Sequence, residues 1–174
     1  MPRTSDSFER EFRAHLDRHT PALVSALRVV ATTAPIPGAS SVAYWIKPDW
    51  REFPARTIAI DEGWPDGILI DMSLVGRAVL EGAGEMVPAG AIDQDAYEAA
   101  GIATDEAAAR VLAEWFGECW HAAGGGQFPS PAYLISGDGS SYYDLRTGGW
   151  AGSGQPAGGR PAEPVGAPVR GGSE

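Results

Sequence analysis

The sequence has little of what disulfide-bonded, secreted or membrane-spanning proteins contain. It has 174 residues with one cysteine, one lysine and no asparagine. One cysteine excludes an internal disulfide and suits a reducing compartment, so we expect a cytoplasmic protein. No apolar run approaches the roughly 20 residues that cross a bilayer, and the N-terminal segment lacks the unbroken apolar stretch of a secretion signal. We therefore expect no membrane association.

Motifs of common cofactor and nucleophile chemistry are also missing. The sequence has no phosphate-binding loop ending in Gly-Lys, no dinucleotide-binding glycine pattern after a strand, no nucleophile elbow and no closely spaced cysteine pair. Lys47 stands beside a proline at a predicted strand end, a poor position for a desolvated amine nucleophile. These absences predict no cofactor.

Negative charge is in excess and is concentrated in the middle of the chain. Asp and Glu number 23 against 13 Lys and Arg, and residues 49–118 alone contain fifteen acids and four Arg. Such a field repels phosphate, which disfavours nucleic acid and anionic membranes as partners. The scarcity of Lys and Asn beside abundant Ala, Gly and Pro indicates a GC-rich bacterial genome.

A change in composition near residue 150 predicts the domain boundary. Residues 151–174 contain seven Gly and four Pro but no Leu, Ile, Met or aromatic residue. Such a segment cannot bury enough apolar surface to offset the entropy lost on ordering. We predict one domain over residues 1–150 and a disordered tail over 151–174.

Apolar residues recur with helical spacing at the N-terminus and near residues 104–123. Asp6 with Glu9 resembles a capping box, and Thr20-Pro21 should interrupt the first segment and begin a second helix. We expect Thr104 to cap the long helix. The apolar stripe of that helix comprises Val111, Leu112, Trp115, Phe116, Cys119, Trp120 and Ala123.

Strand-like runs cover residues 41–46, 57–61, 68–72, 132–136 and 141–146. Short turn-forming connections favour antiparallel neighbours, and Gly137-Asp138-Gly139-Ser140 marks a hairpin. Strands and helices that occur in separate runs are typical of α+β folds. We predict a mostly antiparallel sheet of about five strands packed against an N-terminal helix and the long helix near residues 104–123.

Three candidate sites have plain structural alternatives. His15 and His19 are spaced to share a helix face as metal ligands, but surface histidines are the favoured interpretation. Cys119 falls on the apolar stripe, where a thiol is inert, and His121 points away from it. The segment around Gly101 imitates a helix-turn-helix, yet its second helix would begin with acids that repel DNA; we favour a plain corner between helices.

The strand carboxylates support an alternative, enzymatic function. Asp61, Glu62, Asp71 and Asp144 lie at polar strand positions or strand ends. If they share one sheet face they could form an acid/base pair or hold a divalent metal, as in a hydrolase. A solvated sheet face is the favoured explanation, because no histidine or lysine accompanies them.

Tryptophans among acids suggest a protein-binding surface. Trp50 and Trp64 lie in proline-containing turns, surrounded by Asp49, Glu52, Asp61, Glu62 and Asp66. An indole within an acidic rim is typical of a binding hot spot for a basic partner, although loop tryptophans also fold back over a core edge. Our leading hypothesis is a non-catalytic acidic protein-binding module, such as an immunity or inhibitor-type protein, that docks a basic protein.

Overall fold

The computed structural model describes residues 3–32, 41–46, 56–60, 69–70, 86–136 and 141–152. Its elements follow the order α1 (Ser5–Asp17), α2 (Thr20–Thr32), β1 (Ser41–Ile46), β2 (Arg56–Ile60), β3 (Leu69–Ile70), α4 (Gln94–Ala99), α5 (Thr104–Ala122), the 3-10 turn η1 (Gly125–Gln127), β4 (Ala132–Ser136), β5 (Ser141–Asp144) and β6 (Gly149–Gly152).

The predicted α+β class is confirmed, with a larger sheet than expected. The strand order is β3-β2-β1-β4-β5-β6, six strands where about five were predicted. The additional strand, β6, pairs antiparallel with β5 and ends at Gly152. It therefore extends two residues past the boundary predicted at residue 150, because its glycine-rich sequence carries no strand signal. The rest of the predicted tail lies outside the described residues.

Four of the five pairings between described strands are antiparallel. The fifth pairing, between β1 and β4, joins the antiparallel strands β1–β3 to the antiparallel strands β4–β6. β1 and β4 run parallel at the centre of the sheet, with Val42 opposite Ala132 and Ile46 opposite Ser136. A parallel pair needs a long crossover, which helices usually supply. Here the intervening chain includes α4 and α5, so the crossover brings α5 against the sheet.

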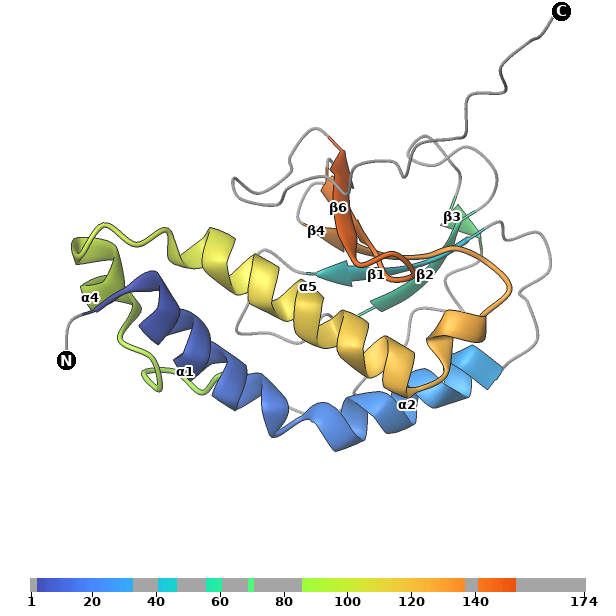
Figure 1. Cartoon of the computed structure of the whole chain (residues 1–174), viewed down its shortest axis with the longest axis horizontal. Helices are drawn as coiled ribbons and strands as arrows, with labels where there is room; N and C mark the ends of the chain where they lie inside the picture. The colour runs from blue at the N-terminus through green and yellow to red at the C-terminus, as the bar shows by residue number, and fades with distance from the viewer. Residues whose placement is uncertain are drawn as a thin grey trace, which may run out of the picture.

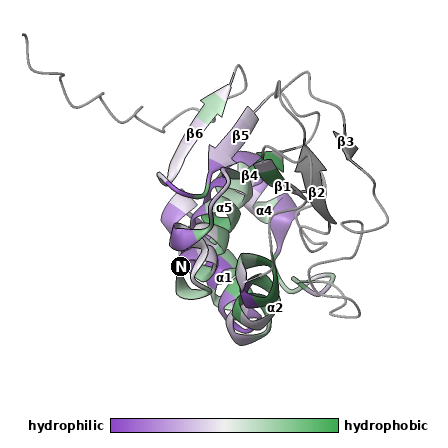
Figure 2. Ribbon diagram, turned by 90° about the vertical axis from the view of Figure 1, so that its right-hand side faces the viewer, coloured by the Kyte–Doolittle hydropathy of each residue, from purple (hydrophilic) through white to green (hydrophobic). Residues whose placement is uncertain are grey.

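The helices gather on one side of the described strands, as two views show (Figures 1 and 2). α5 lies between the sheet and the α1–α2 pair. On its sheet side, Phe116 packs against Tyr44 of β1, with ring centroids 4.9 Å apart. On its other side, the Trp115 indole donates a hydrogen bond to Thr20 of α2 at 2.8 Å. Eleven of the 19 residues of α5 are buried, including its whole predicted stripe up to Trp120, so α5 is the centre of the core.

The N-terminal helical segment breaks as predicted at Thr20-Pro21, but its cap is different. Thr4, in extended conformation, caps α1 through a reciprocal box with Ser7; Asp6 lies inside the first turn instead. Thr20 is the first residue of α2, and its hydroxyl accepts the Trp115 hydrogen bond. The Asp6–Glu9 interpretation was wrong because Thr4 and Ser7 have the same spacing two residues earlier.

The long helix also begins with a different contact from the one predicted. Thr104 is the first residue of α5, and its hydroxyl donates to the Glu98 carboxylate at 2.9 Å, so it does not cap the helix. Glu98 belongs to α4, whose N-cap residue Asp93 accepts a hydrogen bond from the backbone N–H of Ala96. Thr104 therefore ties the two helices together across the turn at Gly101.

Candidate functional site

All seven residues of the predicted binding surface lie outside the described residues. They are Asp49, Trp50, Glu52, Asp61, Glu62, Trp64 and Asp66. That surface stays a prediction, as does the convergence of Asp61, Glu62 and Asp71 in a carboxylate site, since Asp71 is also not described.

Asp144 has a structural role in the turn between β5 and β6. Its carboxylate accepts the backbone N–H groups of Arg146 at 2.8 Å and Thr147 at 3.3 Å. A carboxylate that accepts hydrogen bonds from the backbone two and three residues ahead stabilises a turn. These contacts explain Asp144 without catalysis.

The histidine pair lies at the junction of α1 and α2. Nε2 of His19 is 3.3 Å from the Met86 carbonyl oxygen, and Nδ1 of His15 is buried with no hydrogen-bond partner among the described residues. Loss of hydration lowers the pKa of His15. Within the described ranges, no three His, Cys, Asp or Glu side chains are grouped so as to hold a metal ion.

Cys119 is buried, as predicted. Its side chain is 2% exposed, and burial raises the pKa of its thiol to about 11. His121 is exposed on the other side of α5. A protonated, covered thiol is a poor nucleophile, so the Cys119 position favours a packing role.

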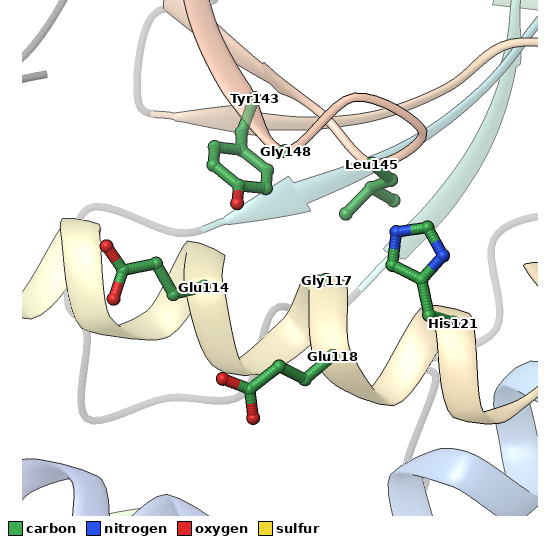
Figure 3. Close-up of a pocket in the computed structure, with 7 residues that line it drawn as sticks. All are labelled: Glu114, Gly117, Glu118, His121, Tyr143, Leu145 and Gly148. Carbon is green, nitrogen blue, oxygen red and sulfur yellow. The ribbon is translucent and has the colours of Figure 1, made fainter. Parts of the chain in front are cut away.

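A pocket lies where the outer side of α5 meets β5 and the turn after it (Figure 3). Its volume is about 260 Å³, and it is partly open to solvent. The lining residues are Glu114, Gly117, Glu118, His121, Tyr143, Leu145 and Gly148. The helix supplies the polar side chains Glu114, Glu118 and His121, and the sheet supplies Tyr143.

Two glycines allow Tyr143 to occupy this position. A Cβ on Gly117 would lie 3.3 Å from Cε1 of Tyr143, so the absence of a side chain in the middle of α5 leaves space for the ring. Gly148 has φ of +74°, a conformation that glycine adopts without strain, and its backbone closes over the Tyr143 hydroxyl. The Tyr143 ring also packs edge-on against Trp150, with centroids 5.5 Å apart.

The electrostatics of the pocket are negative. Burial and the neighbouring carboxylates of Glu114, Glu118 and Asp144 raise the pKa of Tyr143, so its hydroxyl is protonated at neutral pH. Arg13 of α1 holds Glu118 through two hydrogen bonds and also binds Asp17. Figure 3 shows Glu118 extending away from Tyr143.

Glu114 is not neutralised in this way. It forms no hydrogen bond or ion pair with any residue that the structure describes. In Figure 3 the Tyr143 hydroxyl points toward α5, while the Glu114 side chain leaves the same helix with its carboxylate directed away from the ring. Glu114 therefore supplies the uncompensated charge of the pocket.

The pocket continues a row of carboxylates on α4 and α5. Residues 93–118 contain seven acids and one Arg, and all seven acids are exposed. These α4–α5 carboxylates are Asp93, Asp95, Glu98, Asp105, Glu106, Glu114 and Glu118. Arg3 pairs with Asp93 and Arg13 with Glu118, while the one local Arg, Arg110, is bound by Glu9 of α1.

The sequence indicated part of this site. Glu106, Glu114, Glu118 and His121 follow the exposed side of the predicted helix. Tyr143 was not singled out, because only the fold brings it next to α5. Gly117 was the available signal: a glycine inside a long helix costs about 1 kcal/mol relative to alanine, which suggests that another group needs the space.

Comparisons with known proteins give no guide to the site. No protein-family model, curated protein or solved structure matches the chain. Among the described residues, no helix combines the length and apolar character needed to span a membrane.

Proposed function

We propose that the protein is a non-catalytic, cytoplasmic binding module that docks a basic protein through its acidic surface, in the manner of an immunity or inhibitor-type protein. The observation that carries the proposal is the set of exposed α4–α5 carboxylates, seven acids against one Arg that is already paired. Opposite charge accelerates encounter between partners and suppresses wrong ones.

The positions of the potentially reactive groups support binding over catalysis. The thiol of Cys119 is covered and Asp144 is engaged by the backbone of its turn. The carboxylates of Glu106 and Glu114, by contrast, are exposed and form no ion pair with a described residue. Carboxylates with these properties suit recognition of cations.

Trp50 and Trp64 complete the proposal as hydrophobic anchors. Charge steers an encounter, whereas buried aromatic side chains usually supply most of the energy that holds a complex together. We therefore expect Trp50→Ala or Trp64→Ala to raise the dissociation rate, and neutralisation of the carboxylates to lower the association rate.

The test begins with affinity capture of a partner and continues with the purified pair. We expect the Glu106→Gln/Glu114→Gln double variant to lower the association rate constant several-fold at low salt, and the wild-type rate to fall as salt rises. Glu11→Gln, which removes an exposed acid from α1, is the control and should change the rate less. An acidic partner, or an association rate independent of salt and of both variants, would refute the proposal.

A further inference from the structure

A tyrosine hydroxyl that no described residue binds lines the pocket of α5 and β5, and an uncompensated carboxylate lines the same pocket. Tyr143 is 7% exposed, and no described residue forms a hydrogen bond with its hydroxyl. The ring is covered, whereas the hydroxyl lies at the pocket, which is partly open to solvent. The Tyr143 hydroxyl points toward α5 and lines the pocket, so a ligand that enters the pocket can form a hydrogen bond with it in place of water (Figure 3).

The charge of the pocket selects a cation. Glu114 lines the same pocket as the Tyr143 hydroxyl and has no counter-ion among the described residues, whereas Glu118 is already held by Arg13. A ligand that donates several hydrogen bonds and carries one positive charge would satisfy Glu114 and Tyr143 together.

The size and the aromatic lining point to a guanidinium. The pocket volume of about 260 Å³ is below the usual range of small-molecule sites, roughly 300–1,000 Å³, but accommodates one long side chain. The rings of Tyr143 and His121 line it from β5 and from α5. A planar guanidinium offers five donors and stacks on flat rings, whereas an ammonium is a strongly hydrated point charge.

We propose that this pocket receives a single arginine side chain of the basic partner, with Glu114 and the Tyr143 hydroxyl as its hydrogen-bond acceptors. The inference rests on the proposed function and adds the residue of the partner that the protein recognises. Glu118 lines the pocket but stays paired with Arg13.

The test titrates the full chain with N-acetyl-arginine methylamide, whose only charge is the guanidinium, and follows backbone amide signals by NMR. We expect saturable shifts at Gly117 and Gly148 with weak, millimolar affinity. N-acetyl-lysine methylamide should bind at least fivefold more weakly. Equal binding of the two probes, or no saturable shift at these glycines, would overturn the assignment.

Matched variants distinguish binding of the arginine probe in the pocket from its general electrostatic attraction to an acidic protein. Tyr143→Phe removes a hydroxyl that no described residue binds, so it should keep the fold and weaken arginine binding at least fivefold. Glu114→Gln should do the same, whereas Glu106→Gln, with the same charge change two turns earlier in α5, should stay within twofold of wild type. Equal effects of the two glutamate variants would show that only overall charge matters and would refute the pocket.

The experiments distinguish failure of the arginine pocket from failure of the proposed function. If the purified partner binds in a salt-dependent manner but the arginine probe does not bind, the pocket is wrong and the docking surface stands. If the probe binds in the pocket but the partner is insensitive to surface charge, the proposed function fails alone.

Discussion

Three consecutive glycines follow α5, and the structure predicts that replacing each with alanine has a different effect. Gly124 has φ of +94° and nothing near the position of a Cβ, so alanine there meets only backbone strain. A Cβ on Gly125 would overlap the indole of Trp120. Gly126 has neither problem, since its nearest neighbour is Nδ1 of the exposed His121 side chain at 3.3 Å.

The largest loss is expected at Gly125 because Trp120 cannot move aside. Its side chain is 1% exposed and packs edge-on against Tyr44 and Phe128, at centroid distances of 5.8 and 5.6 Å. Overpacking typically costs 1–3 kcal/mol, and each aromatic pair that is disturbed contributes about 0.5–1.5 kcal/mol. Gly125→Ala should therefore lower the free energy of unfolding by about 2 kcal/mol.

The two neighbouring glycines are the controls. A left-handed backbone costs a non-glycine residue roughly 1–2 kcal/mol, so Gly124→Ala should lower stability by about 1 kcal/mol. Gly126→Ala should stay within about 0.5 kcal/mol of wild type, as is usual at exposed positions. Urea unfolding followed by circular dichroism measures all three, and thermal unfolding should place Gly125→Ala roughly 4–8 °C below wild type.

A double-mutant cycle identifies the cause. Trp120→Phe removes part of the ring that the new methyl group would meet, so the cost of Gly125→Ala should be smaller in that background. If Gly125→Ala is as stable as Gly126→Ala, or if its cost is unchanged beside Trp120→Phe, the steric argument is wrong.

Other parts of the core yield three further predictions. Because burial raises the pKa of the Cys119 thiol to about 11, a thiol reagent at pH 8 should label the native protein no faster than the chain opens, and the urea-unfolded chain at once. Thr20→Val removes the acceptor of the buried Trp115 indole and should cost about 1–3 kcal/mol in urea unfolding, whereas Thr20→Ser should keep most of the stability. Loss of hydration lowers the pKa of His15 in the folded state, so its contribution to stability is complete above its ordinary value near 6.5 and is lost as the pH falls below it. Melting temperatures between pH 7.5 and 5.5 should consequently fall more for wild type than for His15→Gln, and equal falls would contradict this account.

Features that depend on nearby residues were predictable from the sequence. The buried stripe of α5 follows from a period of 3.6 residues, and glycine at position 124, just after that helix, adopts the left-handed conformation that commonly ends helices. The break at Thr20 and the cap at Asp93 also depend on neighbouring residues only.

Features set by distant segments were not predictable. The parallel pairing of β1 with β4 joins residues about 90 positions apart, and β6 forms because β5 offers it an edge. The hydroxyl of Thr104 could cap its own helix, but Glu98 of α4 is close enough to accept from it. The pocket has the same origin, since Gly117 and Tyr143 meet only after the crossover places α5 on the sheet.

The buried and exposed sides of α5 have different roles in stability. Its buried side chains join the sheet to α1 and α2, so substitutions of Trp115, Phe116 or Trp120 change the folding of the whole domain. Its exposed carboxylates contribute little to the free energy of unfolding, because surface ion pairs contribute only about 0–1 kcal/mol and Glu114 has no partner among the described residues. Charge on this helix can therefore change while the fold stays the same. Neutralising Glu114 should leave the unfolding transition in place, and under the proposed function it should alter binding of the basic partner.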